Sequence, residues 1–441
     1  NFILQNGGFV PAPHFLFYNL TIYSELALVP AVALGEQVPH IVHMLTGLFF
    51  FLFLADEATE RFQLRNRNWL VPLLVFLPLN LFLLTTVKPD LPAAFFCFAG
   101  ICAYDQKKWK KSAFLFAFAA GIKPTSLLVP LLYIPLSMIR KKEFNIREHL
   151  SMLIPGLVIL LPLILKNAFC IGNPLFPFAN NSFPSTGWDD VRAALVREEM
   201  GAAIRTWTDL LKAPFSFSFN GHGAGGFVGP IFIIFLPFLI FVRRKSESFH
   251  WVPFSLLLLV LGSLQGEAFR YLNLVFSLLL IFVAVTVERL NHPLLWSVLL
   301  CILSLNALQA FSITEHVHRL TAFTFTRETY DSYLSTYMPA LPLHRTINET
   351  LKGKPCRIMM AGEARGYYLQ VPYDVETAHN KSILSPFLVE AQDPQTFAAL
   401  LRAKGYTHLL LDVDGNRSWR SYRRMSDEEE RKLERFLPHL H

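Results

Sequence analysis

The octapeptide Thr85-Thr86-Val87-Lys88-Pro89-Asp90-Leu91-Pro92 decides how this chain folds. It is a short polar break between two apolar runs, 69–87 and 91–104, so we expect a tight loop at a membrane surface. Asp90 stands where the second run begins. A carboxylate there is costly unless it pairs, binds a metal or takes part in chemistry. The alternative is a helix N-cap, in which Asp90 accepts hydrogen bonds from free backbone N–H groups.

The composition is that of an integral membrane protein. Of the 441 residues, 53% are hydrophobic and only 17% are charged, with 41 Phe. The net charge of +7 does not indicate nucleic acid, because the basic residues cluster in short loops. The five cysteines lack metal-binding or CxxC spacing, and Cys97 and Cys102 lie within one apolar run, which indicates buried thiols. The chain opens at Asn1 without a Met or signal peptide, so we expect an upstream span to precede it.

Apolar runs long enough to cross or nearly cross a bilayer recur through the first 312 residues, which predicts an α-helical polytopic protein with about ten or eleven membrane helices. The predicted spans are 38–54, 69–87, 91–104, 112–122, 126–139, 150–168, 227–242, 251–264, 271–287 and 293–311. An earlier run, 18–34, is expected to lie at the interface. The predicted domains are therefore a first outer loop (1–37), a multi-span domain (38–312) and a C-terminal domain (313–441).

Basic residues fall in every second loop between these spans. They follow the first, third, fifth, seventh and ninth runs, at Arg61/Arg65/Arg67, Lys107/Lys108/Lys110/Lys111, Arg140/Lys141/Lys142/Arg147, Arg243/Arg244/Lys245 and Arg289. Such loops are cytoplasmic by the positive-inside rule. The opposite face then receives 1–37, the loop at Asp90, Lys123, the long loop 169–226, the loop 265–270 and the C-terminal domain. We expect this chain in a bacterial inner membrane, with its active site and C-terminal domain outside the cytoplasm.

Ionisable residues from several loops therefore share the outer face: Glu25, Lys88, Asp90, Lys123 and Arg270. Each has a structural alternative. Glu25 could cap or pair locally, Lys123 could extend to the interface, and Arg270 could anchor a helix end or pair with Glu267. The rigid aromatic turn that begins at Asn173 could be a plain re-entrant segment.

The set as a whole suits one chemistry. Lys and Arg at the interface bind a lipid-linked phosphate, and Arg can do so through two parallel hydrogen bonds. A carboxylate beside them, Asp90 or Glu25, can act as general base for an acceptor or, at Asp90, as ligand of a divalent metal. Together they predict transfer of a sugar from a polyprenyl-phosphate carrier to a glycan, lipid or protein acceptor.

Several motifs resemble the GT-C superfamily of polytopic glycosyltransferases, in the branch of protein mannosyltransferases and bacterial aminoarabinose transferases. Lys88-Pro89-Asp90-Leu91-Pro92 is similar to their second acidic motif, and Gly121-Ile122-Lys123-Pro124-Thr125 to their Gly-x-Lys-x-Thr hairpin. The stretches Asn6–His14 with Tyr23-Ser24-Glu25-Leu26, Gly172–Pro177 and Arg270-Tyr271-Leu272 match further patterns in order. The ordered series is more specific than any single motif.

The resemblance implies roles for individual residues. Asp90 would be the second acid, a metal ligand or partner of the base, and Lys123 and Arg270 would contact the donor phosphate, with Lys88 and Asn173 beside them. Glu25 would be a further acid. Family members carry their main catalytic carboxylate early in the first outer loop, before the point at which Asn1 begins.

From about Ser312 the chain changes character. Apolar runs of strand length, 356–361, 373–377 and 408–413, alternate with helical patterns, which predicts a small parallel α/β domain. We expect 362–365 to open a helix, 394–404 to be an amphipathic helix, 330–344 to be a linker and 426–441 to be a solvated helix. No chemistry is predicted in this domain, although it could select the acceptor.

Three other functions remain open. A transporter or flippase would show internal repeats and mid-span charges, and neither is visible. A glycan polymerase or ligase would use an Arg-rich outer loop, and 169–226 contains Arg192, Arg197, Arg205 and Lys212. A non-catalytic envelope scaffold is the third.

Overall fold

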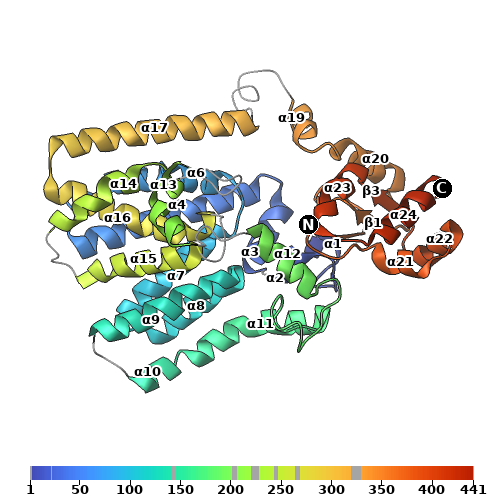
Figure 1. The fold of residues 1–441 in the computed structure, drawn as a ribbon, viewed down its shortest axis with the longest axis horizontal. Helices are drawn as coiled ribbons and strands as arrows, with labels where there is room; N and C mark the ends of the chain where they lie inside the picture. Colours follow the sequence, from blue (N-terminus) through green and yellow to red (C-terminus); the bar gives the residue numbers. More distant parts are fainter. Residues whose placement is uncertain are drawn as a thin grey trace. The chain divides into compact units, whose positions relative to one another are not determined.

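The computed structural model describes residues 2–20, 22–141, 145–200, 206–219, 228–242, 247–263, 269–318 and 329–440. Glu267, Arg205, Lys142 and 243–245, which the sequence singled out, lie outside these ranges. The described chain is mostly helical with one small sheet (Figure 1). It forms two compact units, one of Tyr23–Leu161 with Met200–Leu320 and one of Asn1–Ile22, Pro162–Glu199 and Thr321–His441.

The first unit is a bundle of apolar helices. In chain order its elements are α3 (Tyr23–Leu34), α4 (Val38–Phe62), η1 (Arg67–Trp69), α5 (Leu70–Val75), α6 (Pro78–Thr85), α7 (Asp90–Asp105), α8 (Trp109–Ile122), η2 (Pro124–Leu127), α9 (Leu128–Lys141), α10 (Ile146–Leu150), α11 (Leu153–Ile171, which runs on into the second unit), α13 (Trp207–Phe219), α14 (Ile231–Phe235), η4 (Leu236–Phe241), η5 (Glu247–His250), α15 (Trp251–Ser263), η6 (Phe269–Leu272), α16 (Asn273–Leu290) and α17 (Pro293–His318).

Four helical stretches in the described residues are long and apolar enough to cross a membrane: Val38–Phe62, Ile146–Ile171, Arg270–Leu290 and Pro293–Ser312. The predicted run 69–87 is broken instead, because α5 and α6 meet at a bend of 74°. Pro78 begins α6 and has no N–H to continue the helix. The freed carbonyl of Leu74 accepts a hydrogen bond from the Asn80 amide at 2.7 Å, so the bend is satisfied internally.

Helix α16 is the centre of the bundle. All of its residues from Asn273 to Glu288 are buried. A helix that is apolar on every side is stable only when other helices surround it. It contacts α4, α5, α7, α14 and α15, while α7, α8 and α9 lie side by side (Figure 1).

The helix ends of this bundle gather into two groups. At one end of α7, the Arg61 guanidinium donates to Asp105 at 2.8 Å and the Lys141 ammonium lies 3.6 Å from the same carboxylate. At the other end lie Asp90 and Lys123. The helix between them rises about 22 Å.

The second unit holds the sheet. Its strands β1 (Ile358–Ala361), β2 (Tyr373–Val375) and β3 (His408–Leu411) pair in parallel in the order β2-β1-β3. Every residue of β1 is buried, as a central strand requires. The surrounding helices are α1 (Phe2–Gln5), α2 (Leu16–Leu20), α12 (Asp190–Met200), α19 (Tyr330–Tyr337), α20 (Leu341–Leu351), α21 (Ser385–Glu390), α22 (Pro394–Ala403), α23 (Val413–Ser418), η7 (Trp419–Tyr422), α24 (Asp427–Phe436) and η8 (Leu437–His439).

The parallel α/β prediction for the C-terminal segment is confirmed in this unit, with three local corrections. Residues 362–365 form no helix, because Glu363 turns back to accept the Arg365 N–H at 2.8 Å. The expected linker 330–344 is largely the helices α19 and α20. The C-terminal helix α24 is amphipathic rather than fully solvated, since Leu433 and Phe436 enter the core. In addition, the run 18–34 is divided between α2 and α3.

Candidate functional site

The structure brings together four of the six predicted site residues. Lys88 lies in the loop before α7, Asp90 is the first residue of α7, Lys123 follows the last residue of α8 and Arg270 lies in η6. The Lys123 ammonium pairs directly with the Asp90 carboxylate. Lys88 and Arg270 are close enough to Lys123 for their positive charges to repel its ammonium group. Segments 180 residues apart in the sequence therefore converge on one cluster, the cation cluster of Lys88, Asp90, Lys123 and Arg270.

Asp90 does not cap its helix. The N-cap position is Pro89, and no side chain there bonds the free N–H groups. The Asp90 side chain is only 3% exposed and its described partner is Lys123. Of the two roles that the sequence allowed, the structure thus supports ion pairing. A carboxylate buried at a helix mouth is tolerable because the cation beside it compensates for the lost hydration.

The Tyr271 ring contacts two of the cluster's three cations, Lys123 and Arg270. The Lys123 Nζ atom is 3.5 Å from the centroid of the tyrosine ring, and the Arg270 Cζ atom is 5.1 Å from it. Arg270 Nη2 also donates to the Tyr271 hydroxyl at 3.3 Å. The negative face of an aromatic ring attracts cations. The sequence singled out Tyr271 only as part of a motif, and its position as the shared ring was missed.

The cluster holds three cations and one carboxylate among the described residues. Burial lowers the pKa of Lys123 to about 8, with Asp90 opposing and Arg270 and Lys88 reinforcing the shift. Burial, followed by the charge of Arg270, also lowers the pKa of Lys88. Cations that lower one another's affinity for protons form a positive site that an anion would relieve. Arg270 Nε, which is buried without a hydrogen-bond partner in the described chain, is a donor left for such an anion.

The hairpin that carries Lys123 is held by a glycine contact. A Cβ atom on Gly121 would lie 2.2 Å from the ring of Tyr23, so only glycine lets the ring rest on α8. Tyr23 in turn donates its hydroxyl hydrogen to the Ile159 carbonyl. This contact explains in physical terms why the stretch before Lys123 carries a glycine.

The two remaining predicted residues lie differently. Glu25, on α3, is exposed and accepts a hydrogen bond from Ser24 Oγ at 2.8 Å. Asn173 belongs to the other unit and is fully buried. Its amide donates to the Phe178 carbonyl at 2.9 Å and its oxygen accepts from the Leu175 N–H at 2.9 Å. Asn173 therefore fixes its own loop, and its bonding capacity is used there.

A divalent metal at Asp90 has little support in this geometry. No group of three or more His, Cys, Asp or Glu side chains that could hold a metal is found in the described part of the chain. Mg²⁺ and Ca²⁺ bind through several oxygen ligands. A single carboxylate already paired with an ammonium group does not provide that set, so no step below is routed through a metal.

Comparison with known proteins identifies the family. Residues 27–271 match the model of a domain of unknown function (DUF8201). This chain belongs to that family. The match includes Lys88, Asp90, Lys123 and Arg270, so the whole cation cluster lies within the family domain. No curated protein and no solved structure gave a significant match to the chain.

Proposed function

We propose that the helical unit of this DUF8201 member is embedded in a membrane. The observation behind this proposal is the apolar surface of its longest helices. On α11, Ile154 is 72% exposed, with Leu153, Leu157 and Val158 also exposed, and α17 presents a similar row of leucines. A soluble protein rarely exposes apolar faces of this extent. The basic cluster at the Asp105 end of α7 would then face the cytoplasm.

We further propose that the protein is a glycosyltransferase of the GT-C type that takes its sugar from a polyprenyl-phosphate carrier. The observation that carries this proposal is the meeting of three cations around Asp90 at the opposite end of α7. An isoprenoid tail would remain among apolar helices while its phosphate, at the interface, meets Lys88, Lys123 and Arg270. Few other ligands combine these properties.

In the proposed reaction an acceptor oxygen or nitrogen attacks the anomeric carbon, and the bond from that carbon to the phosphate oxygen breaks. The electron pair of this bond leaves with the phosphate, whose growing negative charge Lys123 and Arg270 stabilise. Asp90 is committed to Lys123, so we assign it a positioning role. We assign the exposed Glu25 on α3 the role of taking the acceptor proton.

The structure weakens the polymerase alternative at one residue. Arg192, in the loop expected to bind glycan carriers, is buried and donates to the backbone carbonyls of Tyr422 and Arg423. It therefore holds two parts of its own unit together. A transporter or flippase would move the lipid-linked sugar across a vesicle without cleaving it, which the experiment below separates.

The experiment uses the full-length protein reconstituted in vesicles with a panel of polyprenyl-phosphate sugars. The proposal expects release of polyprenyl phosphate and a labelled acceptor, with activity lost in Arg270→Ala and Lys123→Met. Lys108→Ala, in the loop at the other end of α7, is the matched control and should retain activity. Sugar flux without cleavage would support the transporter. The absence of both transfer and flux would support the scaffold.

A further inference from the structure

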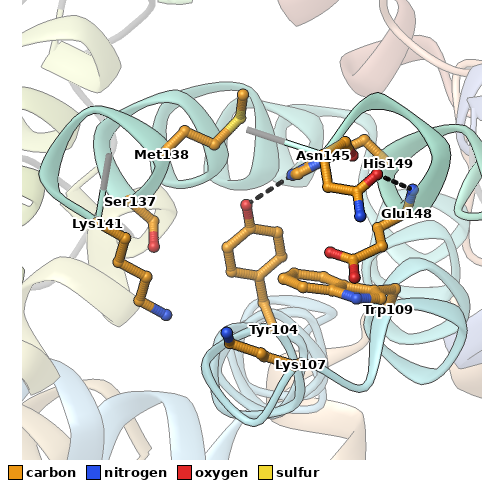
Figure 2. Close-up of a pocket in the computed structure, with 9 residues that line it drawn as sticks. All are labelled: Tyr104, Lys107, Trp109, Ser137, Met138, Lys141, Asn145, Glu148 and His149. Carbon is orange, nitrogen blue, oxygen red and sulfur yellow. Dashed lines mark hydrogen bonds between the residues drawn. The ribbon is translucent and has the colours of Figure 1, made fainter. Parts of the chain in front are cut away.

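A cavity lies at the Asp105 end of the bundle, away from the cation cluster. It has a volume of about 320 Å³ and is lined by the end of α7, the start of α8, the end of α9 and α10. Six of the side chains that line it are Tyr104, Lys107, Trp109, Ser137, Lys141 and Glu148 (Figure 2). The volume suits a small polar ligand rather than a chain of sugars.

Hydrogen bonds and ring contacts fix the floor of this cavity. The Tyr104 hydroxyl bonds the His149 Nε2 atom at 2.9 Å, and His149 Nδ1 bonds the Asn145 carbonyl at 2.8 Å. The Trp109 ring meets the Tyr104 ring edge-on, with 4.8 Å between centroids. Aromatic groups held in this way form a preorganised surface.

Charges of opposite sign occupy opposite sides of the cavity. Figure 2 shows Lys141 and Ser137 on one side of Tyr104, with Glu148 and Trp109 on the other. Within the described chain no cation is paired with the Glu148 carboxylate by an ion pair or side-chain hydrogen bond. The cavity thus presents on one side Lys141, whose ammonium is 3.6 Å from the Asp105 carboxylate, and across the tyrosine an anionic side next to an indole ring.

The cationic side contains an unsatisfied donor. Ser137 is 0% exposed and its hydroxyl has no hydrogen-bond partner among the described residues. A buried hydroxyl without a partner costs free energy, which a ligand oxygen in the cavity would recover.

Lys107 is held on the same side by an unusual backbone. It has φ of +58° at the end of α7, where the Lys108 N–H bonds the Ala103 carbonyl at 2.8 Å. Glycine is the preferred residue at such a helix end, because a side chain is strained there. The lysine at this position therefore indicates a role for its charge that outweighs the backbone strain.

We propose that this cavity binds the phosphoethanolamine headgroup of a membrane lipid. The phosphate would lie between Lys107, Lys141 and the Ser137 hydroxyl, and the ammonium would lie between the Glu148 carboxylate and the Trp109 ring, which attracts cations. A simple anionic headgroup leaves Glu148 facing a negative charge. The zwitterion satisfies both sides of the cavity.

The surroundings favour a lipid over free phosphoethanolamine. Ile139, next in α9 beyond the cavity, is 75% exposed, and Ile146 and Leu150 on α10 are 61% and 54% exposed. These side chains flank the cavity-lining residues along the chain and offer an apolar surface to acyl chains. The inference rests on the proposed membrane insertion but not on the proposed sugar transfer, because the cavity lies at the other end of α7 from Asp90.

The test is native mass spectrometry of the delipidated full chain titrated with phosphatidylethanolamine, phosphatidylglycerol, phosphatidylcholine and free phosphoethanolamine. The proposal expects phosphatidylethanolamine to bind roughly tenfold more tightly than the other two lipids. Glu148→Gln should abolish its advantage over phosphatidylglycerol, whereas Lys141→Ala should weaken both lipids. Glu60→Gln and Lys110→Ala, outside the cavity, are the matched controls.

Lys107→Gly separates binding from folding. It should weaken phosphatidylethanolamine binding while raising the thermal midpoint, because glycine relieves the backbone at the end of α7. Equal binding of the three lipids by the wild-type chain, or an unchanged preference in Glu148→Gln, would overturn the proposal. Full displacement of the lipid by free phosphoethanolamine would contradict the assignment of the headgroup to a membrane lipid. Loss of sugar transfer alone would leave this result unaffected.

Discussion

Replacing Asp90 by Asn tests whether the buried ion pair holds the cation cluster together. The side chains of Asp90 and Lys123 are 3% and 16% exposed, so the substitution leaves a poorly solvated ammonium group without its carboxylate partner and with only the Tyr271 ring beside it. Removing one member of a buried pair costs roughly 3–5 kcal/mol. At pH 6, where Lys123 is charged, we expect Asp90→Asn to lower the free energy of unfolding by this full amount.

The loss should shrink as the pH rises. The ordinary pKa of a lysine is 10.5 and that of Lys123 is about 8 in the folded protein. Without Asp90 the pKa of Lys123 in the folded protein falls further. Between this lower pKa and about pH 8, the variant therefore releases a proton on folding and the wild type largely does not. Its stability relative to wild type therefore rises with pH up to about 8. At pH 8 a neutral Lys123 costs about 3 kcal/mol, which limits the loss.

Lys123→Met gives the opposite control. It leaves a buried carboxylate, whose cost does not decrease as the pH rises. The double variant Asp90→Asn/Lys123→Met removes both charges and should regain most of the stability.

The assay is thermal unfolding of the purified full chain in detergent, followed by intrinsic fluorescence at pH 6 and pH 8. Each single variant should lower the midpoint by about 10 °C at pH 6, given about 2–4 °C for each kcal/mol in a unit of this size. Midpoints within 2 °C of wild type, or a loss in Asp90→Asn that grows with pH, would refute the account of the pair.

Three further predictions concern packing and burial. Gly121→Ala should cost about 1–3 kcal/mol, because its methyl group overlaps a tyrosine ring, whereas Gly156→Ala, with open space around it, should be neutral or stabilising in the same thermal assay. Arg192→Ala should cost about 1–2 kcal/mol, because it leaves two partly buried backbone carbonyls without the donors of a buried guanidinium. The exposed Arg197→Ala should cost less than about 0.5 kcal/mol, and equal effects would contradict the structural role of Arg192. Burial lowers the pKa of His344, so protonation of His344 opposes folding and stability should be lost as the pH falls below 6.5. The difference in thermal midpoint between His344→Met and wild type should therefore change between pH 7 and pH 5. A constant difference would contradict the burial of His344.

The sequence predicted those features that depend on local pattern. Apolar runs gave most of the helices, and the short buried runs after residue 355 gave the three parallel strands and the amphipathic helix α22. The bend between α5 and α6 was missed because Pro78 lies within an otherwise continuous apolar run. The turn at Glu363 was missed because its side chain bonds the backbone and competes with helix formation there.

The candidate site shows the same division. Asp90, Lys88, Lys123 and Arg270 could be chosen from the sequence, because charged residues at the ends of apolar runs are rare. That Lys123 would be the partner of Asp90, and that Tyr271 would lie under both cations, depends on how α7, α8 and η6 pack. Asn173 was chosen on a loop motif, and its hydrogen bonds turn out to be internal to that loop.

The cavity beside Tyr104 was not predicted at all. Its residues come from helix ends beside two basic loops, which the sequence identified only by their charge. The pairing of Tyr104 with His149, 45 residues away, arises only when α7 and α10 come together. A hint lay in Lys107, a residue with a long side chain where the end of a helix usually favours glycine.

The most direct test of the central claim is the binding of polyprenyl phosphate to the purified full-length protein in detergent. The account predicts saturable binding that competes with inorganic pyrophosphate and weakens roughly tenfold in both Arg270→Ala and Lys88→Ala, since each removes a charge from the phosphate site. Lys108→Ala should bind like wild type. An affinity unchanged in both Arg270→Ala and Lys88→Ala would show that the cation cluster does not hold the phosphate.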